Sequence, residues 1–197
     1  MRDDHICFAC RIPFYGILFV FISALCFACT STPTTEEKVQ SATGRYFSLE
    51  HYFAEQSRRL TQAEVMIVKT VDVNGNTETK TLKITNWESE LAAFMDSDIN
   101  KAAWRNSYAV DSSEHTIVYT SLEPNLRTKQ IKLKRSESGE VKEIYINNEI
   151  SNLLYTSQEY LRFYPDSLYE IIRDQTVRIM GKNRYQIRGQ FAPTTGS

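Results

Sequence analysis

The sequence predicts an α+β protein, in which two helices from the N-terminal half pack on an antiparallel, largely meander β-sheet. Helical and strand-like patterns alternate between residues 46 and 97, and from residue 107 onward apolar and polar residues alternate in short segments. The links between these segments are short and turn-like, and such links join neighbouring strands as hairpins. We therefore expect about six to nine strands, in a sheet that could also curve into a half-barrel.

The first helix is predicted over residues 46–63. Leu49, Phe53 and Leu60 recur at helical spacing, and Ser48 is a suitable N-cap residue for this segment. His51 lies one turn before Glu55, which could form half of a metal site, but an exposed polar pair is the better interpretation.

A hairpin follows the first helix. Residues 65–73 are rich in β-branched side chains, Asn74-Gly75 is a strong signal for a type I′ turn, and the return strand covers 77–84. The oxygen-bearing side chains around this turn also resemble a calcium loop. Such a loop needs glycine where Thr77 stands, so the hairpin is the better interpretation.

The second helix is predicted from a capping box formed by Thr85 and Glu88, and it should run to about Ser97. Its apolar residues recur at intervals of three and four, which places them on one face. That face consists of Trp87, Leu91, Phe94 and Met95.

The rest of the chain is predicted to be nearly all strand. One side of each segment is apolar and the other carries lysine, arginine or glutamine, as in an antiparallel sheet with one buried face. Asn147-Asn148 is interpreted as a turn, and residues 158–172 also fit a helix. The predicted strands cover 107–111, 115–121, 127–135, 141–147, 150–164, 167–180 and 184–191.

The N-terminal segment 12–28 is apolar and uncharged. A short apolar segment that ends in small residues is typical of a secretory signal peptide, and an uncleaved signal anchor is the alternative. The four cysteines of the chain, Cys7, Cys10, Cys26 and Cys29, have the spacing of a zinc ribbon. The apolar residues between the two pairs argue against the polar hairpin that such a zinc site needs.

The residues from Leu25 to Cys29 resemble a bacterial lipobox. This resemblance implies that a signal peptide covering 1–28 is removed and that Cys29 carries the lipid that attaches the protein to a membrane. The mature chain would then contain no other cysteine and form no disulfide. Residues 29–44 would be the lipidated cysteine and a Thr/Ser-rich tether, and residues 45–197 a single α+β domain.

The lipobox, the tether and the Lys/Asn/Tyr-rich β domain together resemble the small lipoproteins of Bacteroidota. This resemblance implies a signal peptide and an outer-membrane location, which Thr30 after Cys29 also favours, but no particular activity. Asp166-Ser167-Leu168 resembles the short O-glycosylation sequence of that phylum, which makes Ser167 a candidate glycosylation site.

No catalytic residue, metal ligand or cofactor is nominated by the sequence. It contains neither a G-x-S-x-G motif nor a Gly-rich phosphate loop. His115 follows Glu114 on a predicted strand, so the two side chains point to opposite faces. The net charge of −1 gives no basic footprint for nucleic acid.

Aromatic side chains are the remaining candidates for a ligand or partner surface, because amphipathic rings are common in clefts and interfaces. The alternative is that they cover the buried face of the sheet. These residues are Tyr155, Tyr160, Phe163, Tyr164 and Tyr169.

Three functions are compatible with these patterns. The first is a non-enzymatic binding or accessory subunit that works with another envelope protein. The second is a carrier of a lipid or other hydrophobic ligand, by analogy with half-barrel lipoprotein carriers, and it requires an apolar cavity. The third and least favoured is an envelope hydrolase, which requires convergent acidic residues in a polar cleft.

Overall fold

The computed structural model describes residues 46–192. They form a nine-stranded antiparallel sheet that does not close into a barrel, with helices on one face, which confirms the predicted α+β fold class. The helices are α2 (Leu49–Gln62), α3 (Trp87–Glu90) and α4 (Ala92–Met95), followed by the 3-10 turn η1 (Ala102–Trp104). The strands are β1 (Met66–Val73), β2 (Asn76–Lys83), β3 (Tyr108–Ser112), β4 (Thr116–Ser121), β5 (Thr128–Arg135), β6 (Val141–Ser151), β7 (Tyr155–Tyr164), β8 (Leu168–Val177) and β9 (Gly181–Phe191).

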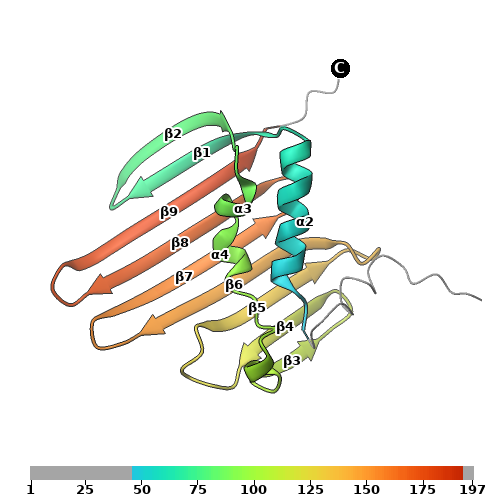
Figure 1. Cartoon of the computed structure of the whole chain (residues 1–197), viewed down its shortest axis with the longest axis vertical. Helices are drawn as coiled ribbons and strands as arrows, with labels where there is room; N and C mark the ends of the chain where they lie inside the picture. The colour runs from blue at the N-terminus through green and yellow to red at the C-terminus, as the bar shows by residue number, and fades with distance from the viewer. Residues whose placement is uncertain (1–45, 193–197) are drawn as a thin grey trace, which may run out of the picture. The chain divides into compact units, whose positions relative to one another are not determined.

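The sheet combines a meander with a hairpin from the start of the domain. The strand order is β2-β1-β9-β8-β7-β6-β5-β4-β3, so each strand from β3 to β9 lies beside its neighbour in sequence. The hairpin β1–β2 adds to the free edge of β9, and Ile67 stands opposite Phe191. The first strand of the domain, β1, is therefore paired with the last strand, β9 (Figure 1).

Helix α2 begins where the sequence predicts. The Ser48 Oγ accepts a hydrogen bond from the His51 amide at 3.1 Å. Asp98, from the loop after α4, accepts hydrogen bonds from the Ser48 hydroxyl at 3.1 Å and from the Glu50 amide at 2.9 Å. These contacts satisfy amide groups that have no partner within the helix and tie its start to that loop.

The second predicted helix is two short helices, so this prediction was wrong in detail. Its N-cap is Asn86, whose Oδ1 accepts from the Ser89 amide at 3.0 Å, and the capping box at Thr85 does not form. The chain leaves helical geometry at Leu91, with φ −97° and ψ 8°. Despite this break, Trp87, Leu91 and Phe94 of the predicted apolar face are all buried.

The predicted β1–β2 hairpin is confirmed. Asn74 and Gly75 have φ angles of 54° and 89°, which are those of a type I′ turn. The carboxylate of Asp72 accepts hydrogen bonds from the Gly75 amide at 2.9 Å and from the Thr77 hydroxyl at 2.5 Å. The oxygen atoms that resemble a calcium loop thus stabilise the turn.

The later strands follow the prediction with one important difference. Asn147 and Asn148 lie inside β6, which continues to Ser151, and the turn comes at residues 152–154. The Asn152 Oδ1 accepts from the amides of Leu154 at 2.9 Å and Tyr155 at 3.0 Å, so this residue makes the turn. Residues 158–172 form strands on either side of the β7–β8 turn and no helix.

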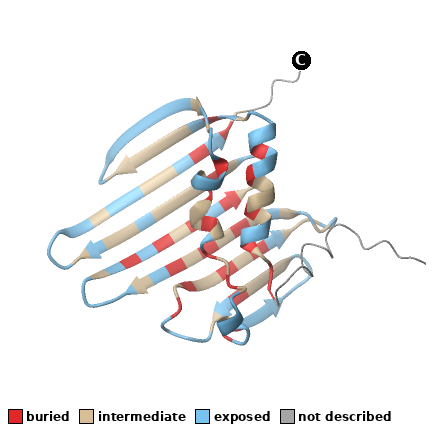
Figure 2. Ribbon diagram, viewed as in Figure 1, coloured by how far each residue is buried: buried red, intermediate tan, exposed pale blue. Residues whose placement is uncertain are grey.

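The core lies between the helices and the middle strands, where Figure 2 shows most of the buried residues. Phe163 of β7 contacts Phe53 of α2 and Phe94 of α4, with ring centroids 5.0 Å and 6.0 Å away. Tyr169 of β8 lies over Gly189 of β9, where an added Cβ would come within 2.1 Å of the tyrosine ring. Glycine is therefore required opposite this buried ring.

The predicted signal peptide, the predicted lipid attachment at Cys29 and the predicted tether lie outside the described residues. Within 46–192, no helix is both long and apolar enough to span a bilayer.

Candidate functional site

The helix-facing side of the sheet changes from apolar to polar along its strands. Residues directly opposite each other on β6, β7 and β8 form cross-strand rows. One row consists of Ile146, Leu161 and Ile171, and it is part of the core. The following row consists of Asn148, Glu159 and Arg173, and the next of Ile150, Ser157 and Gln175.

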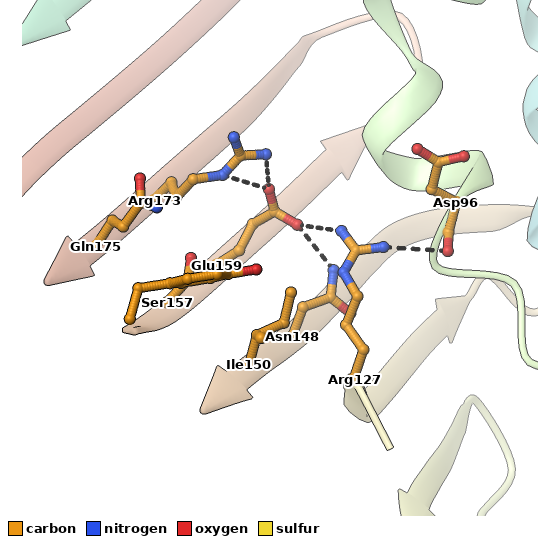
Figure 3. A pocket seen from close by; sticks show the side chains of 9 residues that line it. Asp96, Arg127, Asn148, Ile150, Ser157, Glu159, Arg173 and Gln175 are labelled. Atoms are coloured by element: carbon orange, nitrogen blue, oxygen red, sulfur yellow. Dashed lines mark hydrogen bonds and ion pairs between the residues drawn. The ribbon is translucent and has the colours of Figure 1, made fainter. Parts of the chain in front are cut away.

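Glu159 is the centre of the polar rows. Its side chain is buried, with 4% of its surface exposed, and both carboxylate oxygens accept hydrogen bonds. Oε1 accepts from Nε of Arg173 at 3.0 Å and also from Nη2 of the same residue. Oε2 accepts from Nη2 of Arg127 at 2.8 Å and from Nδ2 of Asn148 at 2.9 Å (Figure 3).

The surroundings of Glu159 favour its ionised form. Burial by itself raises the pKa of this carboxyl, but the hydrogen bonds from Arg173 and Asn148 and the charges of the two arginines outweigh it and lower the pKa. Glu159 is therefore an anion at neutral pH. With its two oxygens occupied, it is poorly suited to give up a proton as a general acid.

Asn148 leaves an acceptor unpaired at the base of the site. Its Nδ2 donates to Glu159 and, at 2.8 Å, to the hydroxyl of Ser97. Its Oδ1 is buried and has no hydrogen-bond partner in the described structure. A buried acceptor without a donor is costly, and because this oxygen has almost no exposed surface, a donor could reach it only if neighbouring side chains moved.

These residues line an open cleft of about 280 Å³, which we call the Glu159 cleft. Arg127 lies just before β5 and donates from Nη1 to the backbone carbonyl of Asp96 at 3.2 Å, which connects the cleft to the end of α4. The Arg127 and Arg173 side chains are 32% and 47% exposed, so a ligand can reach their free N–H groups. The lining residues are Asp96, Arg127, Asn148, Ile150, Tyr155, Ser157, Glu159, Arg173 and Gln175.

A second hollow of about 280 Å³ shares Arg173 with the Glu159 cleft and extends toward β1 and α3. Its lining includes Ile171, Ile187 and Tyr185, so it is more apolar than the first. The ion pair between Lys69 and Glu90, at 2.7 Å, lies at its side. The two hollows together give this face of the sheet a polar part and a neighbouring apolar part.

The aromatic candidates from the sequence do not share one surface. Phe163 and Tyr169 are fully buried in the core. Tyr160 and Tyr164 lie at alternate positions of β7 and therefore on the face away from the helices, where Tyr164 donates to Glu143 at 3.0 Å. Tyr155 alone lines the Glu159 cleft.

The remaining candidate residues lie away from the cleft. Ser167 is exposed in the turn between β7 and β8. His51 is exposed on α2, where Glu55 pairs with Arg58, and His115 lies 3.9 Å from Glu114 at the surface. Among the described residues, no group of three or more His, Cys, Asp or Glu side chains could hold a metal ion.

The sequence analysis missed the Glu159 cleft, although one signal was present. Glu159 has the same strand parity as Leu161 and Phe163, so the alternation places a carboxylate on the buried face. The partners of Glu159 could not be predicted from the sequence. Asn148 and Arg173 lie on other strands and Arg127 just before β5, and only the fold sets the register of these strands. Because Asn147-Asn148 was interpreted as a turn, Asn148 was not expected to lie on the buried face of a strand.

Comparison with known proteins gives no further guidance, since the chain matches no protein-family model, no curated protein and no solved structure.

Proposed function

We propose that this protein is a lipid-anchored protein of the bacterial outer membrane that works as a non-enzymatic binding subunit, with the Glu159 cleft as its binding site. One observation carries this proposal: an ionised, buried carboxylate is held between two partly exposed arginines that line an open cleft. Polar groups that converge in one open cleft are typical of sites that orient a ligand.

The hydrogen-bonding groups of the cleft favour a ligand rich in hydroxyl groups. Arg173 and Arg127 offer N–H groups to acceptors of a ligand. The side-chain oxygens of Asp96, Ser157 and Gln175 in the same lining can accept hydrogen bonds from its donors. A hydroxyl group serves as both donor and acceptor. Tyr155 and Ile150 add apolar surface beside these groups, so a saccharide, or a sugar attached to a partner protein, fits the lining.

The second hollow supports a second candidate, a carrier of an amphiphilic ligand. Ile171, Ile187 and Tyr185 could cover an acyl chain while the shared Arg173 contacts its polar end. In this case the ligand would occupy both hollows.

The two candidates are separated by calorimetric titration of the mature chain with N-acetylglucosamine, glucuronate and dodecanoate. Binding of a sugar supports the saccharide site, whereas binding of dodecanoate supports the carrier. An Arg173→Gln substitution should weaken either interaction by tenfold or more, since a charge-assisted hydrogen bond is lost.

The control variant is Arg184→Gln. Arg184 is similarly exposed and pairs with Asp174 at 3.0 Å on the opposite face of the sheet, so this change removes an arginine from an ion pair without touching the cleft. Equal affinity in both variants, or no binding of any of the three compounds, would argue against the Glu159 cleft as the binding site.

A further inference from the structure

Two hairpin turns at one end of the sheet expose large aliphatic side chains. Leu153 and Leu154, between β6 and β7, are 85% and 71% exposed. Ile179 and Met180, between β8 and β9, are 95% and 79% exposed. The Arg178 amide donates to the Leu154 carbonyl at 3.0 Å, so the two turns lie side by side, and we call these four side chains the apolar tips.

The apolar tips contribute little to the stability of the domain. They lie at the ends of the strands that the helices leave uncovered, far from the buried positions under α2 (Figures 1 and 2). Turns are usually built from polar residues and glycine, which keep the exposed loop soluble. A group of four exposed aliphatic side chains therefore indicates a surface that contacts something apolar.

The apolar tips are surrounded by positive charge. Arg178 and Lys182 flank Ile179 and Met180, and neither forms an ion pair within the described part of the chain. Residues 151–155 and 177–183 contain no acidic residue. The nearest acids along these strands are Glu149 on β6 and Asp174 on β8, and Asp174 is paired with Arg184.

We propose that the apolar tips insert into the surface of a membrane that contains anionic lipids, with Arg178 and Lys182 at the lipid phosphates. Apolar side chains flanked by cations are what interfacial membrane binding requires. A stable protein interface needs about 800 Å² on each partner around a packed centre, and two narrow turns offer no such face. The charges and the protruding shape therefore favour a lipid surface over a protein partner.

Insertion would also orient the domain. Tyr155 directly follows Leu154 and lines the Glu159 cleft, so the cleft would open close to the membrane surface. This contact does not depend on the lipid proposed for Cys29, because it is made by side chains of the folded domain.

The test places a tryptophan at the tips of the whole chain. An Ile179→Trp variant is mixed with vesicles of brominated phosphatidylcholine, with or without phosphatidylglycerol, and its fluorescence is compared with that of the parent, which contains Trp87 and Trp104. We expect additional quenching, and more of it in the anionic vesicles. A Val110→Trp variant is the control, because Val110 is 51% exposed on the edge strand β3, and it should show no additional quenching.

A second set of variants separates the two contributions. Replacing Ile179 and Met180 by serine should reduce vesicle binding at the tips by tenfold or more. Replacing Arg178 and Lys182 by serine should reduce it by about 25-fold in anionic vesicles and leave binding to neutral vesicles unaffected, since each cation contributes about fivefold. All four positions are exposed, so circular dichroism should be unchanged.

Two outcomes would overturn the proposal. One is quenching at position 179 that does not exceed quenching at position 110, which would mean that the tips have no preference for the membrane. The other is unchanged vesicle binding after the serine substitutions at both Ile179 and Met180.

Discussion

At the scale of single residues, Glu159 shows how a buried charge is made tolerable in this sheet. A lone carboxylate in a core would be neutralised by protonation, because burial disfavours the charged form. Here three neighbouring strands supply donors from Arg127, Asn148 and Arg173, and these hold the pKa of Glu159 below its ordinary value of 4.5. The two arginines that stabilise the carboxylate are also partly exposed, so the groups that hold Glu159 are those that a ligand in the cleft could contact.

The lowered pKa of Glu159 makes a prediction about stability and pH. Near pH 4.5 the unfolded chain begins to bind a proton at this residue while the folded chain does not, so stability falls as the pH is lowered further. A Glu159→Gln substitution should cost about 2 kcal/mol at pH 7, because it leaves the two arginines without their anion. The difference in the free energy of unfolding between the two proteins should narrow below pH 4.5.

Urea denaturation at pH 7, 5 and 3.5 measures this difference. Glu149→Gln serves as the control, because Glu149 is exposed on the neighbouring strand β6 and makes no ion pair among the described residues. A difference that stays constant down to pH 3.5 would show that Glu159 is not held ionised.

At the scale of elements, α3 shows how the choice of N-cap residue sets where a helix begins. Both Thr85 and Asn86 are good N-cap residues by sequence, and the capping box favoured Thr85. Capping by Asn86 starts the helix one residue later, and the chain leaves helical geometry at Leu91, with both Trp87 and Phe94 buried. The burial of these large side chains outweighs the local preference for the box.

Capping by Asn86 is tested with a pair of variants. An Asn86→Ala substitution should lower the free energy of unfolding by about 1 kcal/mol, since the hydrogen bond to the Ser89 amide is lost. A Thr85→Ala substitution should change it by less than about 0.5 kcal/mol. Chemical denaturation of both variants is the measurement, and the reverse order would support the capping box.

At the scale of the whole molecule, the proposed function combines a folded domain with a membrane anchor. The proposed tether of residues 30–44 could reach up to about 50 Å when extended, so the domain would sample a large region around its attachment point. Insertion of the apolar tips would restrict that search and give the domain one orientation. The lipid anchor would then keep the domain near the membrane, and the apolar tips would fix its orientation relative to the membrane surface.

The proposed anchor makes the prediction at this scale. A Cys29→Ala substitution should release most of the protein from the membrane fraction, because the lipid would no longer be attached and the tips alone bind reversibly. A Cys26→Ala substitution should leave the protein in the membrane, since this residue only precedes the proposed cleavage site. Fractionation of cells followed by immunoblotting compares the two, and retention of the Cys29→Ala variant would point to an uncleaved anchor.

The sequence by itself determined the local structure of most of the domain. The Ser48 cap, the Asn74-Gly75 turn and the alternation in β5 and β9 depend on interactions between residues close in sequence, and the structure confirms them. The prediction was less accurate at Asn147-Asn148, because asparagine is favoured in turns and only the partner strand made it part of β6.

Only the tertiary structure decided where the cleft and the apolar tips lie. Asn148, Glu159 and Arg173 come together because strand register places them opposite one another, and Arg127 joins them from just before β5. Register depends on how every strand buries its apolar side. The apolar tips likewise form only when two turns, distant in sequence, end at the same side of the sheet. Local patterns fix which residues alternate, whereas long-range pairing fixes which of them meet.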